Sequence, residues 1–329
     1  LSFRTIMIIK KTNFFLIFCI LITIGCDNTN TINPIPTTTP VSVSATVSSS
    51  VPTTTPIPTS PPIINIISTP LTKSSIEQLD VNTKLQNLII KNLGPYNAVN
   101  STFGDIKYDK RFNNEIFLEF GKVYFNRQGN KSYNPAFEFR VPAKTSITSP
   151  ISGIISWFEW QPSQDDWEIH IKPTRDSEWI FGIDHVLSVD CDRSSNPVDI
   201  CDLPLKINGK IAVEGMSINA GDVIGYVGTW SDYDNIGING RTELTVFKYL
   251  GPYGSDGVIN YCPTLYLDKE VESTLKSTIS ELMDSYEKWS GKTSTYDQEN
   301  MPAPGCLYKA IKEVNGKMEL INSSTDLTE

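Results

Sequence analysis

The chain has 329 residues, of which 28 are Lys or Arg and 37 are Asp or Glu, so its formal net charge is −9. This acidic balance argues against a nucleic-acid partner, which would require a basic face. The part beyond residue 72 is long enough to form one sizeable hydrophobic core.

The first 25 residues have the pattern of an export signal. Lys10 and Lys11 precede an apolar run over residues 14–24, and Gly25 stands directly before Cys26. This run is too short to span a bilayer, which takes about 20 residues. We therefore predict a lipoprotein-type signal peptide over 1–25, lipidation at Cys26 and an extracytoplasmic, membrane-anchored protein at the cell surface or in the periplasm. The alternative is an ordinary signal peptide followed by an incidental cysteine.

A tract rich in Thr, Ser and Pro follows over residues 26–72. It holds no aromatic residue and no charged residue after Asp27. Such a composition cannot bury enough apolar surface to offset chain entropy, so we predict a disordered linker.

The folded part is predicted to be mainly β. Residues 73–265 contain short runs rich in β-branched and aromatic residues, separated by Gly, Pro, Asn and Asp, which is typical of antiparallel strands. Helical spacing of apolar residues predicts flanking helices over 74–93 and 268–290. The last forty residues look irregular, and residues 266–329 are predicted to form a C-terminal helix and a tail.

The four cysteines beyond Cys26 form an even set, which in an exported domain favours disulfide bonds. Of the three possible pairings we favour Cys191–Cys201, which closes a short loop, together with Cys262–Cys306, which ties the tail to the core. A zinc site of four thiolates is the rival, but the spacings lack any CxxC pair.

Four segments of the core, residues 134–247, resemble the lysostaphin/LytM-type zinc metallopeptidases that cut peptidoglycan cross-links. They read VPAKTSITSPISGIISWF, IFGIDHVLSV, VEGMSINAGDVIGYVGTW and TELTVF. The resemblance implies an antiparallel β-sandwich or barrel-like domain, the duplicated hybrid motif. It also implies a site with three metal ligands and two catalytic histidines.

In this chain the resemblance puts other residues at most of those positions. Asn134, Glu138 and Thr245 stand where the family has its metal ligands, and His185 and Glu243 stand at the catalytic histidines. Asn and Thr are poor zinc ligands beside imidazole. We therefore expect neither a metal cofactor nor peptidase activity. The alternative is a rebuilt site of His185, Glu138 and Glu243 that binds zinc or a harder cation such as calcium.

The leading hypothesis is a pseudoenzyme: a non-catalytic, surface-tethered lipoprotein whose groove binds a cell-wall glycopeptide, a polysaccharide or an envelope partner. Trp157 and Trp160 join Glu138, His185 and Glu243 as candidate groove residues, although packing in the sheet explains most aromatics equally well. The alternatives are a metal-dependent peptidoglycan endopeptidase with altered ligands and a purely structural envelope protein.

Overall fold

The computed structural model describes residues 84–111, 115–125, 129–191, 201–228 and 240–322. All of them belong to one unit, which spans residues 66–329. The predicted signal peptide, Cys26 and the linker 26–72 lie outside the described residues. Within these ranges, no helix has the length and apolar character that a membrane span requires.

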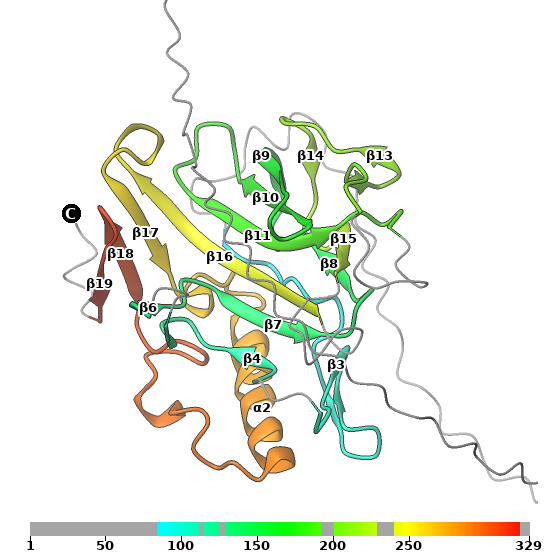
Figure 1. Cartoon of the computed structure of the whole chain (residues 1–329), viewed down its shortest axis with the longest axis vertical. Coiled ribbons are helices and arrows are strands. Elements are labelled where there is room, and N and C mark those ends of the chain that lie inside the picture. Colours follow the sequence, from blue (N-terminus) through cyan, green and yellow to red (C-terminus); the bar gives the residue numbers. More distant parts are fainter. Residues whose placement is uncertain (1–83, 112–114, 126–128, 192–200, 229–239, 323–329) are drawn as a thin grey trace, which may run out of the picture. The chain divides into compact units, whose positions relative to one another are not determined.

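The described residues form a mainly β unit, in which twelve strands make one sheet (Figure 1). Its central path runs in the order β14-β9-β10-β11-β16-β17-β18-β19, and β4, β7, β8 and β15 pair at its sides. Every pairing between these strands is antiparallel, which confirms the predicted fold class. The strands are β4 (Phe117–Leu118), β7 (Phe137–Val141), β8 (Ser146–Thr148), β9 (Gly153–Gln161), β10 (Asp166–Lys172), β11 (Ile180–Leu187), β14 (Ser217–Ile218), β15 (Val223–Val227), β16 (Gly240–Leu250), β17 (Gly257–Tyr261), β18 (Ala310–Val314) and β19 (Lys317–Ile321).

Smaller elements complete the unit. The short strands β1 (Tyr96–Asn97), β2 (Thr102–Phe103) and β3 (Ile106–Lys107) form a three-stranded sheet, and two hairpins are made by β5 (Val123–Phe125) with β6 (Lys131–Tyr133) and by β12 (Lys206–Ile207) with β13 (Lys210–Ile211). Three 3-10 turns are η1 (Pro252–Gly254), η2 (Pro263–Leu265) and η3 (Gln298–Asn300).

The longest strand, β16, organises the sheet. One of its edges pairs with β11, and its other edge pairs first with β7 and then with β17. Alternate residues of β16 and β7 face the core, including Leu244, Val246, Phe137 and Phe139, all of them fully buried. The residues between them, among them Glu243, face the opposite side, because side chains alternate across a strand.

The predicted C-terminal helix is present as α2 (Glu272–Ser290), which lies beside the sheet (Figure 1). It buries Ile279, Leu282 and Tyr286, which are among the apolar residues at helical spacing in 268–290. Gly291 ends the helix in a left-handed conformation, with φ of 74°, a geometry that glycine adopts without steric cost.

The predicted helix over 74–93 is wrong where it can be compared with the structure. Residues 84–93 contain isolated β-bridges and bends but no helical turn, and residues 74–83 lie outside the described part of the chain. Leu85 donates its backbone N–H to the carbonyl of Tyr266, and Gln86 donates to that of Pro150. These tertiary hydrogen bonds and the burial of Leu85 outweigh the helical spacing of the apolar residues.

The last forty residues were expected to be irregular, and this expectation is wrong for residues 310–321, whereas residues 323–329 lie outside the described part of the chain. Strands β18 and β19 form a hairpin that extends the main sheet beyond β17. Asn315 and Gly316, both with positive φ, form its turn. The residues on both sides of 265 therefore share one sheet, and the predicted boundary between 265 and 266 does not separate two domains.

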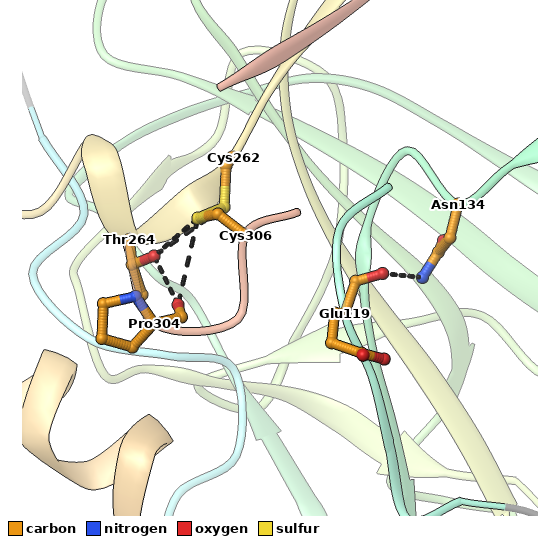
Figure 2. The surroundings of a disulfide bond; sticks show 6 residues. All are labelled: Glu119, Asn134, Cys262, Thr264, Pro304 and Cys306. Atoms are coloured by element: carbon orange, nitrogen blue, oxygen red, sulfur yellow. Dashed lines mark hydrogen bonds between the residues drawn. A yellow bond between two sulfur atoms is a disulfide. The ribbon is translucent and has the colours of Figure 1, made fainter. Parts of the chain in front are cut away.

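Both predicted disulfides are present. Cys191 and Cys201 have Cα atoms 5.9 Å apart, and those of Cys262 and Cys306 are 5.8 Å apart. Figure 2 shows Thr264 beside the second bond, with its hydroxyl 2.7 Å from the carbonyl oxygen of Pro304. The disulfide thus joins the end of β17 to the segment that precedes β18.

Candidate functional site

A row of three carboxylates crosses the face of the sheet that points away from the core residues Leu244 and Val246, which we call the outer face. In the register of the strands, Asp184 of β11 lies opposite Glu243 of β16, and Glu243 lies opposite Glu138 of β7. Opposed side chains in an antiparallel pair are close neighbours, and like charges in this position repel each other. The row therefore needs compensating cations.

His185 joins this row because the backbone is irregular at this point. Three steps along β11, from Ile183 to Val186, face only two steps along β10, from Ile169 to Trp167, which is a β-bulge. His185 has φ of 62°, a left-handed conformation that is uncommon for residues other than glycine. The bulge allows His185 and Asp184, although adjacent in sequence, both to approach Glu243.

Two arginines, each two residues from a glutamate on the same strand, provide the compensating charge. Arg140 forms an ion pair of 2.7 Å with Glu138, and the Arg241 guanidinium lies 3.6 Å from Glu138 and 3.5 Å from Glu243. Arg140 and Arg241 are themselves directly opposite each other on β7 and β16. One guanidinium, that of Arg241, thus lies among the carboxylates of both strands.

The His185 imidazole is buried and lies between acidic groups. Its Nδ1 is 2.7 Å from Asp166, and its Nε2 is 3.5 Å from Glu243 and 3.6 Å from Asp184. Burial alone would lower the pKa of His185, but the hydrogen bonds to Asp166 and Glu243 outweigh it and raise this pKa to about 10. His185 is therefore a cation at neutral pH.

The Arg241 guanidinium also contacts Nε2 of His185. Because a guanidinium only donates hydrogen bonds, this contact is a hydrogen bond only to a neutral imidazole. The surrounding carboxylates favour the imidazolium, so the two cations lie side by side and share Glu243 between them.

The carboxylates of the row respond differently to this environment. Burial raises the pKa of Glu138 despite Arg140, and it raises the pKa of Asp184 to about 6. Burial alone would also raise the pKa of Glu243, but the hydrogen bond to His185 and the charge of Arg241 outweigh it, and this pKa is lowered. Glu243 is therefore ionised and held by the two cations.

The row lines a cavity of about 400 Å³, which we call the polar pocket. Amide and phenol groups add hydrogen-bonding capacity to its charged wall. Its lining residues are Leu118, Lys122, Tyr124, Asn134, Pro135, Glu138, Arg140, Gln161, Gln164, Asp184, His185, Arg241 and Glu243. The structure thus brings together four of the five residues that the resemblance placed at family positions.

The fifth, Thr245, does not line the polar pocket. It lies opposite Gly182, where its hydroxyl would be 2.4 Å from a Cβ atom at that glycine. Asn134 lines the pocket, but both polar atoms of its side chain form hydrogen bonds with backbone groups. Its amide nitrogen donates to the Glu119 carbonyl at 3.2 Å, as Figure 2 shows, and its oxygen accepts from the N–H of Ala136.

These residues do not fit the zinc centre that the family resemblance implies. Asn134 has both polar atoms engaged, Thr245 lies elsewhere, and Glu138 is paired with two arginines. The nearest alternative donor set is Asp166, Asp184 and His185, whose oxygen and nitrogen atoms lie within 4.8 Å of one another. Asp166 lies 2.7 Å from Nδ1 of His185, whereas Asp184 lies 3.6 Å from Nε2. The two carboxylates therefore approach different nitrogens of the ring and do not converge on one of them.

The two predicted groove tryptophans are on opposite faces of the sheet. Trp157 pairs with His170 across β9 and β10, and the two ring centroids are 4.5 Å apart. Trp160 pairs with Trp167, on the other face, with ring centroids 5.6 Å apart. Trp157 lines a second cavity on the outer face, so neither tryptophan reaches the polar pocket.

The arginines were missed in the sequence, although a signal for them exists. Glu138 and Arg140 are two residues apart on one strand, and Arg241 and Glu243 are two apart on another. This spacing puts each acid and its arginine on the same face. The two matching pairs indicate a charge network across two strands.

A scan against models of protein families and a search of curated proteins found no match. Among solved structures, the catalytic domain of a mutant of the prophage-encoded M23 protein EnpA from Enterococcus faecalis is 15% identical, with 45% of this chain and 89% of that chain covered and a TM-score of 0.27. Lysostaphin is 13% identical, with 41% and 44% covered and the same TM-score. Csd3 from Helicobacter pylori is 14% identical, with 60% and 47% covered, again at 0.27.

Proposed function

We propose that this protein is a non-catalytic binding protein of the bacterial cell envelope, and that its polar pocket binds a cell-wall glycopeptide. The observation that supports this most directly is the position of Arg241. Its guanidinium lies within 3.6 Å of Glu138 and Glu243 and against His185, so a fixed organic cation is placed where a metal ion would need those same atoms.

The lining of the polar pocket suits a peptide with free amide and carboxylate groups. Glu243 and Asp184 accept hydrogen bonds from N–H groups, whereas Arg140 and Arg241 donate to carbonyl and carboxylate oxygens. Gln161 and Gln164 do both. A cavity of about 400 Å³ has the size of small-ligand sites, which range over ~300–1,000 Å³.

The same proposal includes attachment of the protein to a membrane through its N-terminal part. A lipid at Cys26 and a linker over residues 26–72 would hold the folded unit outside the cytoplasm, at a distance from the membrane. Such a tether suits a protein that contacts the wall while it remains anchored to the membrane.

Sedimentation of the purified protein with cell-wall sacculi tests the binding, alongside release of soluble wall fragments and elemental analysis for zinc. We expect co-sedimentation without hydrolysis and without stoichiometric zinc. Glu243→Gln should weaken binding about tenfold, since it removes a charge-assisted hydrogen bond. Glu319→Gln, at an exposed position of β19, is the matched control. Stoichiometric zinc together with hydrolysis that Glu243→Gln abolishes would instead establish the metal-dependent endopeptidase.

A further inference from the structure

A second cavity, of about 710 Å³, lies on the same outer face of the sheet as the polar pocket. We call it the Trp157 cavity. Glu243 and Tyr249 are both odd-numbered residues of β16, and they line the polar pocket and the Trp157 cavity respectively. Six residues of strand separate them, a distance of ~20 Å. The two cavities are therefore distinct sites along one face.

The Trp157 cavity contains an aromatic ring whose orientation is fixed by packing against a neighbouring side chain. The half-buried Trp157 ring rests against the buried ring of His170, and Nε2 of His170 is 2.9 Å from Glu168. Tyr249, which is 46% exposed, lines the same cavity. Amphipathic rings of this kind bind ligands through an apolar surface, and a ring whose orientation is already fixed loses little entropy on binding.

Two basic side chains, Lys172 and Arg175, line the Trp157 cavity. Neither Lys172 nor Arg175 forms an ion pair with another residue in the described part of the chain. By contrast, Lys248 pairs with Glu178 at 3.4 Å. In a chain with a net charge of −9, two such cations in one hollow favour an anionic ligand.

The remaining polar groups limit how much negative charge a ligand can carry. Asp176 and Glu178, both exposed, line the same cavity as the two cations. They can accept hydrogen bonds from hydroxyl groups, but they would repel a densely charged group such as a phosphate dianion. A ligand with hydroxyls, an apolar face and a single negative charge matches all of these features.

We propose that the Trp157 cavity binds a pyranose ring that carries a carboxylate, as one unit of an acidic polysaccharide. The sugar stacks its C–H face on Trp157, its carboxylate lies between Lys172 and Arg175, and its hydroxyls donate to Asp176 and Glu178. This site has its own lining and does not depend on the function proposed for the polar pocket.

Isothermal titration of the purified protein with tetragalacturonate, and with the neutral cellotetraose, tests this proposal. We expect saturable binding of tetragalacturonate and binding of cellotetraose at least about tenfold weaker. Trp157→Ala should weaken the binding of tetragalacturonate by about tenfold or more, and Lys172→Gln combined with Arg175→Gln should reduce it to the level of cellotetraose.

Two control variants make the result specific. Trp160→Ala removes a tryptophan from the opposite face of the sheet, and Glu243→Gln alters only the polar pocket, so both should bind tetragalacturonate within about twofold of the original protein. Because Glu243→Gln is expected to weaken binding to sacculi, a failure of the glycopeptide proposal can be told apart from a failure of this one. Circular dichroism establishes that each variant is folded. If Trp157→Ala does not fold, the double variant Lys172→Gln with Arg175→Gln decides whether the carboxylate is bound.

Three results would overturn the proposal. The first is an absence of saturable binding of tetragalacturonate to the original protein. The second is equal affinity for tetragalacturonate and cellotetraose, which would remove the role of the carboxylate. The third is an equal loss of affinity in Trp157→Ala and Trp160→Ala, since a site on the outer face cannot depend on a residue of the other face.

Discussion

Glu138 and Glu243 lie directly opposite each other on β7 and β16, and the guanidinium of Arg241 is within 3.6 Å of both. Two glutamates in this position would repel each other in its absence, and both are largely removed from solvent, with side chains 6% and 17% exposed. Arg241 is therefore a structural requirement of the site as well as an obstacle to a metal ion.

Replacing Arg241 with Met should destabilise the fold. Removing one partner of a buried ion pair costs ~3–5 kcal/mol, and the 20% exposure of the Arg241 side chain reduces this to about 2 kcal/mol. The free energy of unfolding in urea measures the loss. Adding Glu243→Gln should restore part of it, because the opposed charges are then gone. Arg111→Ala, at an exposed ion pair, is the control. A loss in Arg241→Met no larger than in Arg111→Ala would contradict the interpretation.

The left-handed backbone conformation of His185 predicts which of two substitutions at this position is the more stable. Glycine adopts a φ of 62° freely, whereas alanine is strained there by about 1 kcal/mol. Both His185→Gly and His185→Ala lose the imidazole and its contacts with Asp166 and Glu243. Glycine itself costs ~0.5–1 kcal/mol relative to alanine in a strand, which offsets part of this strain, so we expect the glycine variant to be the more stable by up to about 0.5 kcal/mol in urea unfolding. Greater stability of the alanine variant would mean that the left-handed conformation is absent.

The strands were predictable from the sequence because their pattern is local. Runs of β-branched and aromatic residues between turn residues marked the sheet, and the family resemblance placed Glu138, His185 and Glu243 near one another. The tail hairpin was missed although it carries a local signal, since Asn315-Gly316 between alternating apolar residues is a strong indication of a two-residue turn.

What could not be predicted depends on contacts between distant segments. Apolar residues at helical spacing in 84–93 are buried in a segment without helix, because the backbone of Leu85 pairs with residues near Tyr266. The bulge that turns His185 toward Glu243 has no glycine to mark it. The ion pairs of Arg241 follow from the register between β7 and β16, which the sequence of each strand alone does not specify.

Glu119 should make stability depend on pH. Burial raises its pKa from 4.5 to about 7, and Lys122 offsets only part of this. Between these values the folded state keeps a proton that the unfolded state releases. The stability that protonated Glu119 provides is therefore fully present below pH 4.5 and is lost as the pH rises through 7, by on the order of 3 kcal/mol.

A Glu119→Gln variant isolates this effect from other titrating groups, such as Asp184. Glutamine stays neutral, so the variant should match the original protein near pH 4.5 and exceed its free energy of unfolding at pH 8 by about 3 kcal/mol. Urea unfolding at the two pH values measures the difference, with Glu319→Gln on the exposed face of β19 as control. A difference between variant and original that does not change with pH would show that Glu119 has the same pKa in the folded and the unfolded state.

The two disulfides should differ in what they contribute, because they close loops of different length. Cys262 and Cys306 are 44 residues apart and Cys191 and Cys201 only 10. Chain entropy then gives about 4 kcal/mol for the first bond and about 3 kcal/mol for the second. Replacing each pair by serine and measuring urea unfolding under oxidising conditions tests the order. The longer loop also contains α2, and its disulfide joins the segment before β18 to the end of β17, so removal of Cys262–Cys306 should cause the larger loss. A greater loss from the Cys191–Cys201 variant would mean that the shorter loop stabilises the sheet through direct packing, beyond the entropy of closure.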